Sequence, residues 1–151
     1  MEILNRQEAL VTNYEVLMVL QEEDQRYKKI KSAPHAKYPE NVHTLKFEAL
    51  KYLNSTACAT QSAEQILSLK NGLAGYDLTK AEVLQIINLR PKKQVELYLI
   101  IEECEERFAS EDVEDILRVV TSALPRDDDD EDEEAGDNME EGEDEMDVDN
   151  S

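Results

Sequence analysis

Three short motifs predict where helices begin in this chain. Thr12-Asn13-Tyr14-Glu15, Ser62-Ala63-Glu64-Gln65 and Thr79-Lys80-Ala81-Glu82 each place a Ser or Thr three residues before a Glu or Gln. In such a capping box, the hydroxyl and the longer side chain both bind backbone N–H groups of the first helical turn. These repeated helix starts predict a mainly α body. The chain has only four glycines, which excludes a Gly-rich phosphate-binding loop.

Further start and stop signals complete the pattern. Gly75 and Pro91 are typical helix stops, and Ser110 is a further N-cap candidate. Ile3-Leu4 and Ala9-Leu10-Val11 are short enough to be strand pieces, which gives a short N-terminal β/helix segment. The helices are expected over about 13–24, from 42 to about 53, from 63 to about 74, over 80–90, from 92 to about 103, and over 110–124.

Apolar spacing predicts which side of each helix faces a core. On the helix that begins at 42, one face is formed by Val42, Leu45, Ala49 and Leu53, with Phe47 and Leu50 beside it. On the last helix it is Val113, Ile116, Leu117, Val120 and Leu124. The helix over 13–24 is apolar on nearly all sides before Gln21, so we expect a second surface to cover it. The prediction is a small helical bundle of short helices that depend on mutual packing.

Charge is distributed very unevenly along the chain. The net charge is −20, from 36 acids against 16 bases; residues 127–151 hold 16 of these acids and no base, which leaves about −4 on residues 1–126. Self-repulsion and scarce apolar residues predict a disordered acidic tail over 126–151. The tail is interpreted either as a solubilising segment or as a nucleic-acid mimic that competes for basic surfaces. The negative net charge excludes a globally basic nucleic-acid-binding protein, but it does not exclude a local basic patch.

These patterns divide the chain into a partner-binding segment at 1–24, a flexible basic loop at 25–41, a helical domain at 42–125 and the tail. The partner-binding candidates are the apolar residues of the first segment: Ile3, Leu4, Leu10, Val11, Tyr14, Leu17 and Met18. The candidates for nucleic-acid contact are lysines near the two prolines of the loop: Lys28, Lys29, Lys31 and Lys37. A solvated linker is the alternative interpretation of this loop.

No residue pattern predicts catalysis, a metal or a cofactor. His35 and His43 have no cysteine or acid at metal-ligand spacing, and Cys58 and Cys104 lie too far apart in sequence for a zinc motif. The pairs Glu102-Glu103 and Glu105-Glu106 are better explained by a solvated helix end than by acid–base chemistry. No apolar run approaches the roughly 18 residues of a membrane span, and no signal peptide is visible at the N-terminus. We therefore expect a non-catalytic protein of a reducing compartment.

Several blocks in order resemble the smaller stalk subunit of RNA polymerase III, a family that also carries the name calcitonin gene-related peptide receptor component. The central block is the 14-residue stretch 78–91, LTKAEVLQIINLRP. Further blocks are Leu10–Val16, Phe47–Leu53, Val95–Leu97 and Ile101–Arg107, so the resemblance runs from residue 1 to about 125. The tail lies outside it.

The resemblance implies a nuclear, non-catalytic subunit that pairs with a larger stalk subunit carrying an oligonucleotide-binding barrel. It implies contacts with the polymerase core and initiation factors, and a role in promoter-dependent initiation at small RNA genes such as those for tRNA and 5S rRNA. A weak contact with RNA is a further candidate interaction. It also implies a helical part similar to the C-terminal domain shared by certain helicases and ribonuclease D. Two alternatives are a signalling adaptor of a neuropeptide receptor and an acidic-tail chaperone of basic proteins.

Overall fold

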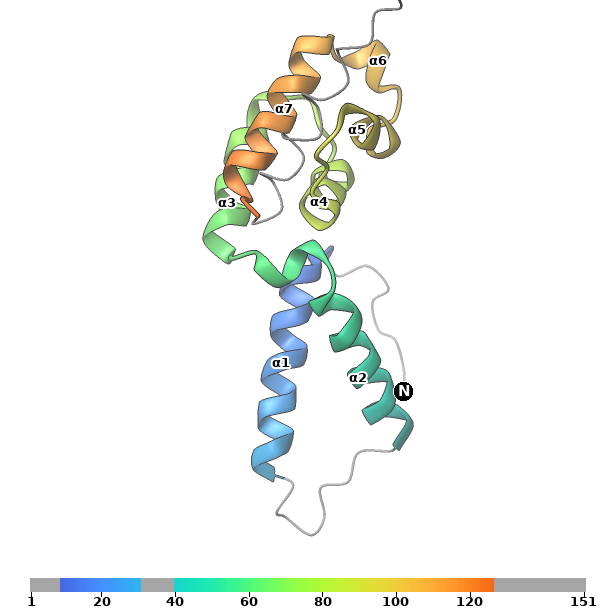
Figure 1. Cartoon of the computed structure of the whole chain (residues 1–151), viewed down its shortest axis with the longest axis vertical. Helices are drawn as coiled ribbons and strands as arrows, with labels where there is room; N and C mark the ends of the chain where they lie inside the picture. Colours follow the sequence, from blue (N-terminus) through green and yellow to red (C-terminus); the bar gives the residue numbers. More distant parts are fainter. Residues whose placement is uncertain (1–8, 31–39, 127–151) are drawn as a thin grey trace, which may run out of the picture.

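The computed structural model describes residues 9–30 and 40–126, and these residues are helical with no strand among them. The elements are α1 (Asn13–Ile30), α2 (Glu40–Asn54), the 3₁₀ turn η1 (Ala57–Thr60), α3 (Ala63–Gly72), the 3₁₀ turn η2 (Leu73–Gly75), α4 (Lys80–Leu89), α5 (Gln94–Ile100), α6 (Cys104–Arg107) and α7 (Ser110–Ala123). Figure 1 shows an α1–α2 hairpin at one end of the molecule and a bundle of α3–α7 at the other, with η1 between them. The expectation of a mainly α fold is confirmed.

All three predicted capping boxes form. Ser62 and Thr79 each accept a hydrogen bond from the third residue of their helix, and that residue's side chain binds the cap's own backbone N–H. At the first box, the N–H of Thr12 donates to a carboxylate oxygen of Glu15 over 2.6 Å, and the N–H of Glu15 donates to the Thr12 hydroxyl over 3.2 Å. These bonds need only residues three apart, so the motif alone predicts them.

The ends of the helices differ from expectation in several places. Ala109, not Ser110, is the N-cap of α7, and the Asp112 carboxylate accepts from the Ala109 N–H. Arg90 ends α4 in the left-handed region at φ 49°, rather than in the extended region favoured before proline. α5 ends at Ile100, before the expected 103. Gly75 closes η2 without a positive φ.

Residues 25–30 were expected in a mobile loop, yet α1 continues through them to Ile30. Arg26 bonds Glu22 over 2.6 Å and Lys28 bonds Asp24 over 2.7 Å, both at i,i+4 spacing. Such pairs support an exposed helix, and they are the physical reason for the correction. Ala9 to Val11, expected as a strand piece, is irregular. Ile3 and Leu4, the other expected strand piece, lie outside the described residues.

The core of the bundle is formed by the buried residues of α3 to α7. It consists of Leu69, Leu73, Ile86, Ile87, Leu97, Ile100, Ile101, Cys104, Val113, Ile116, Val120 and Leu124. The predicted inner stripe of α7 is confirmed, with Leu117 packed at its edge. α3 and α7 approach closely, because a Cβ added at Gly72 would lie 2.7 Å from Cγ1 of Val119.

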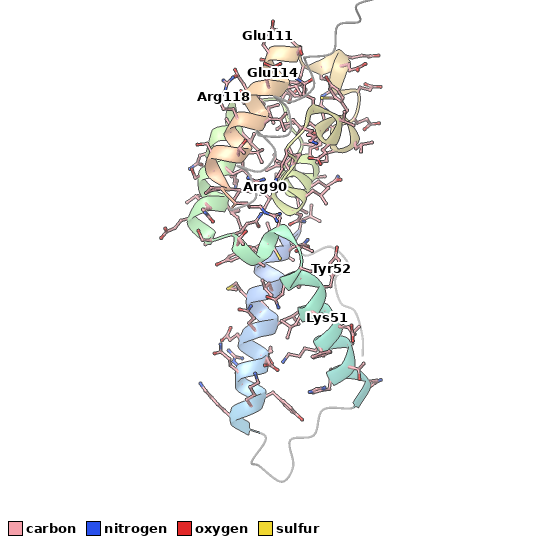
Figure 2. All side chains as sticks on the ribbon, viewed as in Figure 1. Lys51, Tyr52, Arg90, Glu111, Glu114 and Arg118 are labelled. Carbon is pink, nitrogen blue, oxygen red and sulfur yellow. The ribbon has the colours of Figure 1, made fainter. Side chains whose placement is uncertain are left out.

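Polar bonds join the hairpin to the bundle. The Gln61 side-chain amide donates to the carbonyl of Ile87 over 2.7 Å, and the Asn13 N–H donates to Oδ1 of Asn88 over 2.9 Å. Within the bundle, Nε of the buried Arg90 donates to the Leu124 carbonyl over 2.6 Å, and Figure 2 places Arg90 where the bundle meets the hairpin. Through the bond between Asn88 and Asn13, the end of α4 holds the first residue of α1 in place.

Candidate partner interface

The α1–α2 hairpin holds three of the seven predicted partner-binding residues and has a small core of its own. Leu17, Leu53 and Cys58 are buried there, with Tyr14, Val16, Leu20 and Leu50 packed against them. Leu17 is 2% exposed to solvent. It is therefore a core residue of this chain, and a substitution there would disturb folding before it disturbed a partner contact. Tyr14 is half-buried on the same core.

Apolar side chains on α1 and in the irregular segment just before it are exposed to solvent. Leu10, Val11, Met18 and Val19 are all exposed. Met18 is turned about 100° around the helix axis from the buried Leu17, and Val19 about 200°. Met18 therefore lies on the flank of α1, and Val19 lies on the side away from the hairpin core. We call these four residues the α1 outer face. Three of them were predicted as partner-binding residues, and Val19 was missed although it belongs to the same apolar run.

An uncovered groove of about 840 Å³ lies between the two helices of the hairpin. Figure 1 shows α1 and α2 diverging with distance from η1, and the groove lies between the diverging helices. Its apolar lining includes Leu20, Tyr27, Val42, Leu45, Phe47, Ala49 and Leu50. Sequence spacing placed Val42, Leu45 and Phe47 in a core, but all three are exposed, Leu45 by 71%. The prediction was wrong because α1 covers only the part of α2 nearest η1.

Polar and charged side chains line the same groove. They are Glu23, Asp24, Lys28, His43, Lys46 and Lys51. A hydrogen bond from Lys28 lowers the pKa of the Asp24 carboxyl, with smaller contributions from the charges of Lys28, Lys46 and His43. The groove can therefore accept an apolar partner segment whose polar groups meet charges of both signs at the rim.

The structure describes two of the four lysines that were predicted to contact nucleic acid. Lys28 and Lys29 are exposed on the last turn of α1, and Lys28 is paired with Asp24. Lys31 and Lys37 lie outside the described residues. The local carboxylates Glu22, Glu23 and Asp24 offset much of the positive charge on this turn.

The described residues show no arrangement suited to catalysis. Residues 9–30 and 40–126 gather no group of three or more His, Cys, Asp or Glu side chains that could hold a metal ion. Cys58 and Cys104 are buried free thiols, and burial raises the pKa of the Cys104 thiol. Such thiols are poor nucleophiles. Among the described helices, none combines the length and apolar character that a membrane crossing requires.

This geometry is that of a helical interaction module, with an apolar groove and an apolar helix face in place of a reaction centre. The family model described as RNA polymerase Rpb4 matches residues 10–124, which include both surfaces. The chain therefore belongs to the RNA polymerase Rpb4 family.

Curated relatives agree with this assignment. The DNA-directed RNA polymerase III subunit rpc9 of Schizosaccharomyces pombe is 36% identical over 129 residues, which span 83% of this chain and 100% of the relative. The protein of the same name from Dictyostelium discoideum is 28% identical over 133 residues, 82% of this chain and 91% of the relative. That of Saccharomyces cerevisiae is 35% identical over 71 residues, 47% of this chain and 44% of the relative.

Proposed function

We propose that this chain is a non-catalytic subunit of DNA-directed RNA polymerase III and acts in the nucleus. The observation that carries the proposal is the family match over residues 10–124, together with a relative of that name matched over its whole length. The names of the matched relatives favour this function over the receptor adaptor and the acidic-tail chaperone. The proposed role is support of promoter-dependent initiation at small RNA genes such as those for tRNA and 5S rRNA.

The proposed partner is a larger stalk subunit with an oligonucleotide-binding barrel, and the two subunits form the stalk heterodimer. Support comes from the hairpin, which leaves both the α1 outer face and the groove uncovered. Contiguous exposed apolar surface of this kind is typical of a protein–protein interface. Residues 1–24, including Ile3 and Leu4, are the proposed contact segment, and the polymerase core and initiation factors are proposed as further contacts.

Co-purification with two matched variants tests this function. The tagged full-length chain is recovered from nuclear extract, and its companions are identified by mass spectrometry. RNA polymerase III subunits are expected with the unaltered chain. Met18→Glu combined with Val19→Glu places charges on the α1 outer face and should release the stalk partner. Ala81→Glu adds a charge at an exposed position of α4 and should retain it.

Recovery of receptor or histone proteins in place of polymerase subunits would contradict the proposed function. Polymerase recovery that the double variant leaves unchanged would contradict the proposed interface alone. Circular dichroism of each variant checks that the helices persist, since Met18 and Val19 are exposed.

A further inference from the structure

Helix α5 is apolar on all sides but covered on only one. Five of its seven residues, QVELYLI, are apolar or aromatic. Leu97 is fully buried and Ile100 is nearly so, whereas Val95 is 66% exposed and Leu99 is 84% exposed. A helix that is apolar around its circumference is normally buried on every side. The outer side of α5 is therefore an apolar surface that no other part of the described structure covers.

The exposed residues form one continuous strip beside a hollow. Val95 and Leu99 are four residues apart and so neighbour each other on the helix surface, with Tyr98 alongside. A depression of about 280 Å³ adjoins Tyr98 and is lined by Tyr98, Ile101, Glu103, Cys104, Glu105 and Glu106. We define the α5 face as Val95, Tyr98 and Leu99 with the four acids Glu102, Glu103, Glu105 and Glu106.

The surroundings of this strip are strongly acidic. Residues 92–115 contain nine acids and three bases, so their net charge is −6. Two of the bases, Lys92 and Lys93, precede α5, and the third, Arg107, binds Glu82 and the carbonyls of Asp77 and Glu102. The four acids of the α5 face are exposed, and their carboxylates have no hydrogen-bond or ion-pair partner among the described residues. Figure 2 shows Glu111 and Glu114, also acidic, at the same end of the bundle.

We propose that the α5 face binds a cationic amphipathic segment of another protein, with large apolar side chains set beside lysines or arginines. The apolar strip would receive the apolar side chains, and the acids would pair with the cations. Like charge disfavours nucleic acid, an anionic membrane surface and a second copy of this chain, whose net charge is −20. The chain's own basic residues at the end of α1 lie at the opposite end of the molecule (Figure 1).

The proposal goes beyond the proposed polymerase function and does not rest on it. The α5 face belongs to the bundle, whereas the groove and the α1 outer face belong to the hairpin. Loss of one surface should therefore leave binding at the other intact.

The probe is a fluorescein-labelled peptide of about 18 leucines and lysines, with the leucines spaced to form one face of a helix. Its control is a scrambled peptide of the same composition, which has the same charge but no apolar face. Both are titrated into the full-length chain and followed by fluorescence anisotropy across a salt series. The patterned peptide should bind about tenfold more tightly, because only it can use the apolar strip.

Substitutions locate the binding. Val95→Ser with Leu99→Ser should weaken patterned-peptide binding about tenfold, whereas Leu67→Ser, at an exposed position of α3, should not change it. Glu105→Lys with Glu106→Lys should weaken binding and reduce its dependence on salt. In the unaltered ¹⁵N-labelled chain, the patterned peptide should shift the backbone amide signals of residues 95–106.

Two results would overturn the proposal. Equal affinity for the patterned and scrambled peptides would show attraction to acidic charge alone, as the 16 acids of residues 127–151 could provide. Amide shifts confined to residues 127–151 or to the hairpin would show that the α5 face is not the site. The amide measurement needs no substitution, so it decides the question even where a variant folds poorly.

Discussion

Arg107 reaches across the bundle to Glu82, the residue that completes the cap of α4. Nη1 of Arg107 lies 2.6 Å from Oε1 of Glu82, and Oε2 of the same carboxylate accepts from the Thr79 N–H over 2.7 Å. Glu82 is 6% exposed. One carboxylate thus closes the first turn of α4 and holds the end of α6, and Arg107 also lies 5.2 Å from the centre of the Phe108 ring.

This pair predicts a specific loss of stability in acid. The hydrogen bond from Arg107 is the main cause that lowers the pKa of Glu82 from 4.5 to about 2. Because the folded pKa lies below the unfolded one, the stabilisation is complete above about pH 4.5 and is lost as the pH falls towards 2. It amounts to about 3 kcal/mol at neutral pH. Urea unfolding between pH 7 and pH 2 measures it.

Glu82→Gln is the matched control for that measurement, because it keeps the shape of the side chain and removes the charge. The variant should be less stable than the unaltered chain by about 2–3 kcal/mol at pH 7, and the difference should vanish near pH 2. If the difference in stability between the two proteins stays constant with pH, the charge of Glu82 is not the source of the stabilisation.

Thr79→Ala should cost about 1 kcal/mol, because it removes the hydroxyl that accepts from the Glu82 N–H. Ser110→Ala is the matched comparison, since Ser110 is the first residue of α7 and not its cap. It should change stability by less than about 0.5 kcal/mol. Thermal unfolding compares the two. Any loss of function in Thr79→Ala should follow stability; selective loss at unchanged stability would make Thr79 a contact residue.

Leu17→Ala should destabilise the chain by about 2–5 kcal/mol, because it leaves a cavity between α1, α2 and η1. Met18→Ala, one residue further on and exposed, should cost less than about 1 kcal/mol. Hydrogen exchange of the α1 amides distinguishes the two, with faster exchange expected only for Leu17→Ala. Equal effects would contradict the assignment of Leu17 to the hairpin core.

Deletion of residues 127–151 should raise non-specific RNA binding at low salt. It removes 16 acids and no base, which changes the net charge from −20 to −4. The tail would otherwise shield Lys28, Lys29, Lys31 and Lys37 by a weak attraction, screened over about 8 Å near physiological salt. RNA binding by the full-length and truncated heterodimers across a salt series is the measurement. Identical curves at low salt would leave the tail only a solubilising role.

Helix starts and most helix stops could be predicted because their causes are local. The boxes at Thr12, Ser62 and Thr79 require bonds between residues three apart, and each formed as expected. The end of α1 could not be read in the same way, because the prolines at 34 and 39 suggested an early loop. The ion pairs of Arg26 and Lys28 extend the helix to Ile30.

The candidate interface was predicted only in part, since apolar spacing identifies a helix face but not what covers it. Leu10, Val11 and Met18 are exposed, as a partner surface requires. Leu17, expected in that surface, is buried, and Phe47, expected near the core, is exposed. Which of two apolar faces is covered depends on the crossing of α1 and α2, and that crossing has no local signature.

The helical class, the three capping boxes, the acidic tail and the family can all be recognised in the amino-acid sequence. The pairing of Glu82 with Arg107, the bond from Asn13 to Asn88, and the exposure of the groove and the α5 face became visible only in the folded chain. The difference lies in the distance along the chain over which each interaction acts. Caps and charge repulsion act between near neighbours in the chain, whereas burial and long-range pairing depend on how whole helices pack.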